Sequence, residues 1–187
     1  MTDFVPPIPI HLAGLPTAGG LVVPRITPQT ASGQFLFGNL SDVAQHRFLL
    51  GYRCQICASI LPRRAVLFAR ISDLLLMCTS EPATCPPCAR YSALACPMLK
   101  GQMRHYRAGP HPALTERPPT TQKLARHGAP AESWYAVWVQ TYTVIDHPVH
   151  PGTLAASWRD ILPLQIRPVS RATSAAHGSP PPEQQQP

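Results

Sequence analysis

The sequence predicts an α+β protein built on a small mixed or antiparallel sheet. Aromatic and β-branched residues dominate the twelve positions from Trp134 to Ile145, which is typical of a strand inside a packed sheet. Pro86 and Pro87 precede a short apolar run and fit the first turn of a helix, where their missing N–H groups cost nothing. Two Cys-x-x-Cys pairs precede this strand and indicate an inserted metal-binding unit.

Composition divides the chain into five segments. Its 24 prolines gather near the N-terminus, between residues 109 and 130, and after residue 178. Stretches so rich in proline and poor in apolar residues do not form a packed core. We expect N-terminal strands and a short helix in 1–50, a four-cysteine unit in 51–103, a Pro-rich basic loop in 104–133, C-terminal strands in 134–170 and a disordered tail in 171–187.

The first segment predicts two short strands within Ile8–Thr27 about a turn from Pro16 to Gly20, because Gly19-Gly20 allows positive φ. A third strand is expected over Gln34–Leu40, and a helix over Val43–Leu50 that Gly51 ends. We expect these N-terminal strands to share one sheet with the C-terminal strands. Thr153 to Trp158 is expected to return beside the long strand.

Between the cysteine pairs, Ala65–Phe68 predicts a strand. Arg70–Met77 fits either the returning half of a hairpin or a short helix, because its apolar pattern does not separate the two. Cys88–Leu94 continues the helix that the two prolines open, and Pro97 stops it. Asp73 and Glu81 are expected to pair with nearby arginines and to orient the cysteine turns.

The two pairs are Cys54/Cys57 and Cys85/Cys88, with 27 residues between them, Ala58 through Thr84. Each pair places two sulfurs on one turn, and two such pairs complete the tetrahedron of a structural Zn²⁺. In a treble-clef site, a Cys-x-x-Cys turn (a zinc knuckle) is followed by a hairpin and then by a second knuckle that opens a helix. The sequence therefore predicts a treble-clef-like Zn²⁺ unit.

Two further cysteines leave alternatives open. Cys78 lies seven positions before Cys85 and could replace one of the ligands. Cys96 follows Cys88 by about two helical turns and is expected to be a core thiol. A redox dithiol is less favoured, because neither pair follows the strand of a βαβ unit.

The formal net charge is +7, carried by fourteen Arg and two Lys. Such a surface attracts nucleic acid or an acidic protein partner, although scattered arginines also serve as ordinary solubilising charge. The sequence shows no secretory signal and no apolar stretch long enough to cross a membrane. We expect a cytoplasmic protein whose thiols stay reduced.

Two classes of enzyme that use cysteine-bound zinc need further catalytic residues, and the sequence lacks them where they are required. A zinc deaminase needs His-x-Glu before its cysteines, and the sequence has none. A nuclease of the HNH type needs histidines within its four-cysteine frame, and no His occurs between Arg53 and Gln102. A degenerate form of such a metal-dependent hydrolase could still use His105, His147 or His150 brought near the metal.

The segments CQIC, TSEPATCPPCARY, ACPML and WYAVW, with PTAGGLVVPRIT before them, resemble a group of uncharacterised proteins of actinobacteria and their phages. The resemblance spans about Ile8 to Val169. It implies an actinobacterial or actinophage origin and transfers no activity.

The sequence thus favours a non-enzymatic zinc-binding module that contacts nucleic acid or an acidic protein. The degenerate HNH-like hydrolase is one alternative. A protein-interaction adaptor of a phage or mobile element is the other.

Overall fold

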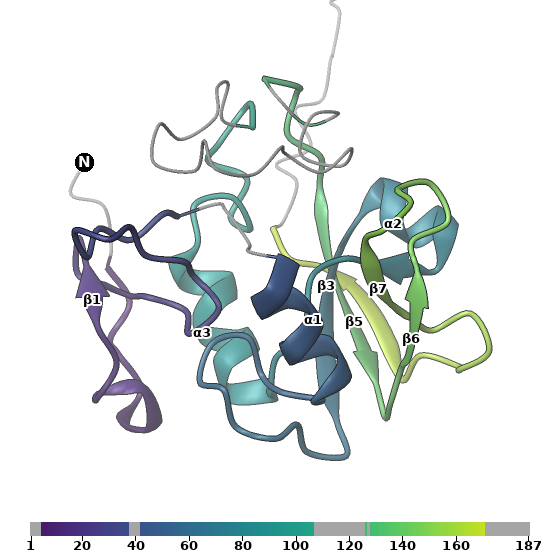
Figure 1. Cartoon of the computed structure of the whole chain (residues 1–187), viewed down its shortest axis with the longest axis horizontal. Helices are drawn as coiled ribbons and strands as arrows, with labels where there is room; N and C mark the ends of the chain where they lie inside the picture. The colour runs from purple at the N-terminus through teal and green to yellow at the C-terminus, as the bar shows by residue number, and fades with distance from the viewer. Residues whose placement is uncertain (1–4, 38–41, 107–125, 127, 171–187) are drawn as a thin grey trace, which may run out of the picture.

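The computed structural model describes residues 5–37, 42–106, 126 and 128–170 of the chain. Short helices and three small antiparallel sheets make up this part, which confirms the predicted α+β class (Figure 1). The elements are the 3₁₀-helix η1 (Ile10–Leu12), β1 (Thr17–Ala18), β2 (Leu21–Val22), α1 (Asp42–Leu50), β3 (Ala65–Arg70), α2 (Ile71–Leu76), β4 (Cys78–Thr79), α3 (Pro86–Ala95), β5 (Trp134–Val139), β6 (Thr143–Asp146), β7 (Leu154–Ser157) and β8 (Gln165–Pro168). The expected tail, 171–187, and most of the expected loop lie outside the described residues.

The two larger sheets hold three strands each, in the orders β3-β5-β8 and β4-β7-β6. β3 pairs with β5 along its whole length, from Ala65 opposite Val139 to Arg70 opposite Trp134. All six residues of β3 are buried. This strand is therefore covered on both faces, in agreement with its apolar run from Ala65 to Ala69.

The predicted single strand from Trp134 to Ile145 is wrong, because the structure has two strands there. β5 ends at Val139 and belongs to one sheet, whereas β6 pairs with β7 in the other. Tyr142 lies in the bend between them, is 2% exposed, and donates its hydroxyl to the Leu49 carbonyl at 2.9 Å. Gln140 and Thr141 of the bend are polar and exposed, and they interrupt the apolar run for only two positions before the buried Tyr142.

The N-terminal segment forms a hairpin, β1 and β2, but its first strand lies inside the expected Pro16–Gly20 turn, and Ile10–Leu12, within the region expected to hold the first strand, is helical. Gly19 and Gly20 between the strands have φ of 56° and 77°. Two successive positive φ angles are what a two-residue hairpin turn requires. In place of the third expected strand, the described residues show one isolated bridge between Gln29 and Phe35, and residues 38–40 lie outside them.

The expected joining of N-terminal and C-terminal strands is wrong. β1 and β2 form a sheet of their own, and the C-terminal strands β5 and β7 are joined instead by β3 and β4, from within the cysteine segment. The β1–β2 hairpin instead contacts α3, where the Val22 N–H donates to the Tyr91 hydroxyl at 3.0 Å. The expected return at 153–158 is confirmed as β7, and β8 forms an edge strand between Pro163 and Pro168.

Three helices take their bounds from local sequence. α1 ends at Leu50, as predicted, and a Cβ at Gly51 would lie 2.7 Å from the Arg47 carbonyl oxygen. The segment after Arg70 is the helix α2 and not a returning strand. α3 begins with Pro86 and Pro87 in its first turn, as predicted.

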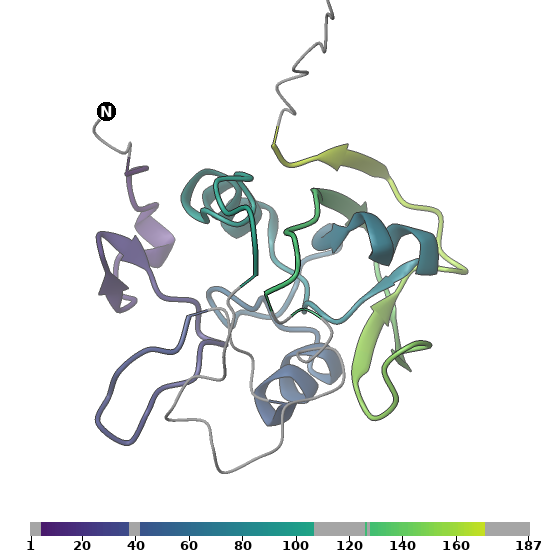
Figure 2. The same cartoon turned by 90° about the horizontal axis from the view of Figure 1, so that it is seen from above.

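The largest core cluster lies between α1 and the two three-stranded sheets. Its buried members are Leu49, Ala65, Leu67, Ala69, Ala83, Val137, Val139, Tyr142, Ala156 and Trp158. The hairpin and α3 lie at one end of the molecule, and α2, β6 and β7 lie at the other (Figures 1 and 2). Among the described residues, every helix is too short or too polar to cross a bilayer.

Candidate metal centre

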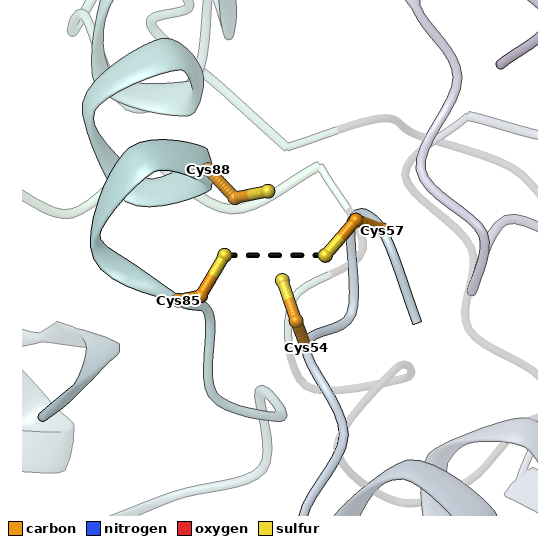
Figure 3. Close-up of side chains that lie close together, drawn as sticks. All are labelled: Cys54, Cys57, Cys85 and Cys88. Carbon is orange, nitrogen blue, oxygen red and sulfur yellow. Dashed lines mark hydrogen bonds between the residues drawn. The ribbon is translucent and has the colours of Figure 1, made fainter. Parts of the chain in front are cut away.

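Four cysteines from two distant segments come together in space. The Sγ atoms of Cys54, Cys57, Cys85 and Cys88 all lie within 4.8 Å of one another (Figure 3). Sγ of Cys57 is 3.9 Å from Sγ of Cys85. Four Zn–S bonds of about 2.3 Å in a tetrahedron hold the sulfurs about 3.8 Å apart. The cluster therefore has the donors and the dimensions to hold one metal ion.

The first pair lies on a tight turn. The Ala58 N–H donates to the Cys54 carbonyl at 2.8 Å, and the Cys54 N–H donates to the Ser59 carbonyl at 2.8 Å. Ala58 takes a φ of 63°, in the left-handed region where the chain reverses. The turn thereby directs both Cys54 and Cys57 toward the same point (Figure 3).

The second pair lies at the start of α3. Cys85 occupies the N-cap position and Cys88 lies one turn later, with the Ala89 N–H donating to the Cys85 carbonyl at 2.9 Å. The N–H groups and the dipole at a helix N-terminus favour a negatively charged thiolate. This end of α3 is therefore suited to bear anionic ligands.

Backbone hydrogen bonds fix the two turns relative to each other. The Gln55 N–H donates to the Ala83 carbonyl at 3.0 Å, which joins the first turn to the strand-like segment before the second. Val66 of β3 and Thr84 exchange two backbone hydrogen bonds of 2.9 and 2.8 Å. The buried strand β3 therefore positions the second turn.

The thiol groups influence one another's protonation. Hydrogen bonds from the Cys54 and Cys88 side chains lower the pKa of Cys85 to about 4, against the opposing effect of burial. The hydrogen bond with Cys54 and then that with Cys85 raise the pKa of Cys88. Of these two residues of α3, Cys85 therefore forms a thiolate more readily than Cys88.

The other two cysteines lie outside the cluster. Cys78 belongs to β4, is fully buried and pairs opposite Ser157; burial raises its pKa to about 11. The possibility that Cys78 replaces a ligand finds no support, since it is not a member of the four-sulfur group. Cys96 packs against the apolar cluster around Val66 and Phe68, as expected of a core thiol.

One neighbour of the cluster is absent from the sequence-based prediction. Nε2 of His11, on η1, lies 3.4 Å from Sγ of Cys88. Among the described residues the metal-binding group consists of the four cysteines, so His11 contacts a ligand without being one. The 77 positions between His11 and Cys88 leave no signal in the sequence that would link them.

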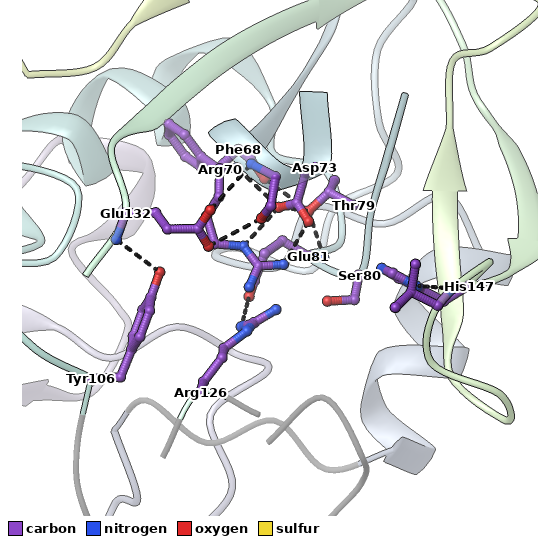
Figure 4. Close-up of polar contacts among 12 residues, drawn as sticks. Phe68, Arg70, Asp73, Thr79, Ser80, Glu81, Tyr106, Arg126, Glu132 and His147 are labelled. Atoms are coloured by element: carbon purple, nitrogen blue, oxygen red, sulfur yellow. Dashed lines mark hydrogen bonds and ion pairs between the residues drawn. The ribbon is translucent and has the colours of Figure 1, made fainter. Parts of the chain in front are cut away.

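A second polar cluster surrounds Arg70 at the end of β3 (Figure 4). Arg70 Nε and Nη2 donate to the two Asp73 carboxylate oxygens at 2.8 and 2.6 Å, and the Arg70 N–H also donates to Asp73 at 2.9 Å. Burial opposes the charge on Arg70, but the hydrogen bond and charge of Asp73 outweigh it and raise the pKa of Arg70. The expected pairing of Asp73 is therefore confirmed.

Glu81 also pairs with an arginine, although with one from far along the chain. Its carboxylate lies 3.8 Å from Nη1 of Arg126 (Figure 4). Burial raises the pKa of Glu81 and lowers that of Arg126. This pair joins Arg126 to the segment between β4 and α3.

The candidate catalytic histidines do not join the cysteines. His147 is buried in the turn after β6 and accepts a hydrogen bond from the Val149 N–H at its Nδ1, while its ring lies 4.6 Å from that of His150. His105 is exposed and pairs with Pro130 in an isolated bridge. In the described part of the chain, the potential metal ligands gather only at the four cysteines.

Comparisons with known proteins add no assignment to this geometry. No family model, no curated protein and no solved structure matches the chain.

Proposed function

We propose that the chain is a non-enzymatic zinc-binding module that contacts nucleic acid through arginines beside its metal centre. The four converging sulfurs are the observation that carries the zinc assignment. Four sulfur donors in a tetrahedron are typical of zinc or of iron–sulfur chemistry. One ion with four cysteines in a reducing cytoplasm favours Zn²⁺.

The ion would have a structural role. Cys54, Cys57, Cys85 and Cys88 would fill all four positions, so no position stays open for a catalytic water. A first cysteine turn and a second that opens α3 support the description as a treble-clef-like unit, although the expected hairpin between them is absent: β3 pairs with β5 and β4 with β7. The metal would join the first turn directly to the start of α3.

The charge around the first turn supports an anionic partner. Residues 43–72 contain five arginines and no acidic residue. Only one of the five, Arg70, is buried in an ion pair. The other four are exposed, as is Arg25 earlier in the chain. These exposed arginines lie on α1, in the turn itself and on the adjoining loops: Arg47, Arg53, Arg25, Arg63 and Arg64.

Backbone contacts tie these arginines to the metal-binding turn. The Arg25 N–H donates to the Ile56 carbonyl at 3.0 Å, and the Arg53 side chain donates to the Ala58 carbonyl at 3.0 Å. Guanidinium groups bind phosphate through two parallel N–H donors. The metal centre would therefore hold a positively charged loop in a fixed shape for a phosphodiester backbone.

Salt-dependent binding tests this function. We expect the zinc-loaded protein to bind a random-sequence DNA duplex or RNA with an affinity that falls steeply as salt rises. The triple variant Arg25→Gln, Arg63→Gln, Arg64→Gln should flatten the slope of log K against log salt by about 3, roughly one for each phosphate that is no longer neutralised. Arg53 is kept because its side chain supports the turn.

A matched triple variant of exposed arginines away from this turn provides the control: Arg104→Gln, Arg159→Gln, Arg167→Gln. It makes the same change in net charge and should leave most of the slope intact. Equal effects of the two triple variants would mean that net charge alone, and not the position of the arginines, accounts for the binding. No binding of either nucleic acid at low salt would contradict the proposal and favour an acidic protein partner.

A further inference from the structure

The N-terminal segment is fastened to both halves of the cysteine cluster. Leu12 is fully buried in an apolar cluster that includes Cys54 and Cys88. The Val22 N–H donates to the Tyr91 hydroxyl of α3 at 3.0 Å, and the Ile26 N–H donates to the Gln55 carbonyl at 3.1 Å. η1 and the β1–β2 hairpin therefore lie next to α3, the helix that begins with the second cysteine pair (Figure 2).

This docking brings one imidazole to one sulfur. His11 immediately precedes the buried Leu12, and its Nε2 lies 3.4 Å from Sγ of Cys88. The His11 residue is otherwise exposed to solvent. The buried Leu12 thus holds His11 in place while the His11 ring contacts the cysteine cluster.

The chemistry of a loaded site sets the direction of this hydrogen bond. A divalent ion with four thiolates carries a net negative charge, and a metal-bound thiolate can accept a hydrogen bond but cannot donate one. The proton of the His11–Cys88 contact must then lie on Nε2. An N–H donor withdraws electron density from the sulfur and so lowers its tendency to take up a proton and leave the metal.

We propose that His11 is an outer-sphere residue of the metal centre, which donates Nε2–H to the Cys88 thiolate and thereby slows release of the metal. The inference rests on the proposed zinc site but not on nucleic-acid binding. His11 is a positioning residue in this role, because it acts on the metal through a ligand.

Two substitutions separate the hydrogen bond from the bulk of the side chain. His11→Gln keeps an N–H donor at nearly the position of Nε2, whereas His11→Leu fills similar space without a donor. His105→Ala replaces another exposed histidine and serves as the control. Wild type and variants are purified with zinc, and the rate of metal transfer to an excess of a coloured chelator is measured at neutral pH.

We expect His11→Leu to release zinc about 10-fold faster than wild type, the lower end of the effect of removing a hydrogen-bond partner of a metal ligand. His11→Gln and His105→Ala should stay near the wild-type rate. With Co²⁺ in place of zinc, the sulfur-to-metal charge-transfer band should move to lower energy in His11→Leu, because its thiolate is richer in electrons. The band should stay unchanged in His11→Gln.

A wild-type release rate and an unchanged band in His11→Leu would overturn the inference and leave the zinc site standing. A His11→Gln variant as impaired as His11→Leu would also overturn it, since the donor would then be irrelevant. Wild-type protein purified without any metal would instead refute the zinc assignment itself. Amide hydrogen exchange of residues 9–26, unchanged between wild type and His11→Leu, would show that faster release does not come from undocking of the segment.

Discussion

Sγ of Cys57 and Sγ of Cys85 lie 3.9 Å apart although 28 positions separate them in the chain. Cys78 is nearer to Cys57 in the sequence, yet it belongs to the β4–β7 pairing and not to the cluster. The difference arises because Thr84 and Val66 of β3 exchange backbone hydrogen bonds. This pairing returns the chain to the first turn just before Cys85. Proximity in space is decided here by strand pairing.

The first prediction concerns the ligand set. Cys85→Ser should abolish stoichiometric zinc binding and leave the protein far less stable, because the folding of such a unit is coupled to the binding of its ion. Cys78→Ser, in a buried position away from the cluster, should keep one zinc per chain even if it lowers the unfolding temperature. Metal content by elemental analysis, together with thermal unfolding, checks both variants.

Zinc retained by Cys85→Ser would contradict the four-cysteine assignment. Zinc missing from a folded Cys78→Ser would mean that Cys78 is a ligand after all. Treating wild type with a strong chelator should reproduce the effect of Cys85→Ser on stability, and adding Zn²⁺ should reverse it.

The second prediction concerns the Arg70–Asp73 pair, whose side chains are 5% and 2% exposed. Asp73→Asn should destabilise the zinc-loaded protein by about 3–5 kcal/mol, because it leaves a buried guanidinium without its carboxylate. Glu132→Gln serves as the control, since Glu132 contacts Ser72 at the surface. That variant should cost no more than about 1 kcal/mol.

Urea unfolding of the two variants measures these changes in the free energy of unfolding. Equal stabilities of Asp73→Asn and wild type would show that the pair contributes specificity of structure and no net stability. The zinc content of both variants must equal that of wild type for the comparison to hold.

The third prediction concerns pH. Burial, and then the neighbouring His150, lowers the pKa of His147 to about 4. The unfolded chain therefore takes up a proton at this residue as pH falls through about 6.5, whereas the folded protein does so only near pH 4. The stability that depends on neutral His147 is present above pH 6.5 and is lost, by roughly 1–3 kcal/mol, as pH falls toward 4.

His147→Asn removes this titration but keeps an acceptor for the Val149 N–H. Wild type should lose stability more steeply than His147→Asn between about pH 7 and pH 5, as followed by urea unfolding at each pH. Protonation of the cysteine ligands acts in both proteins and cancels in the difference. Parallel curves for the two proteins would refute the assignment of a depressed pKa to His147.

Much of the candidate site was readable in the sequence because its information is local. Two Cys-x-x-Cys pairs name the four donors, and Pro86-Pro87 places the second pair at a helix start. Gly19-Gly20 and Gly51 likewise mark a turn and a helix end, since each requires a backbone conformation or a closeness of approach that other residues resist.

The strand partners were not readable in the same way. The apolar run from Trp134 to Ile145 indicates buried extended chain, but the corner that assigns its halves to different sheets is marked by only two polar residues, Gln140 and Thr141, before the buried Tyr142. Composition reports burial and not the direction of the chain. The expected pairing of the N-terminal strands with the C-terminal strands was wrong for the same reason, because composition does not show which strands pair.

The sequence by itself determined the class of fold, the four sulfur donors and the positive charge beside them, because these follow from residue type and short spacing. Only the tertiary structure decided that β3 carries the second cysteine turn to the first, that Cys78 is excluded, and that His11 meets Cys88. Those relationships join residues far apart in the chain. They depend on which strands and helices pack together, and that is a property of the whole folded chain and not of any segment.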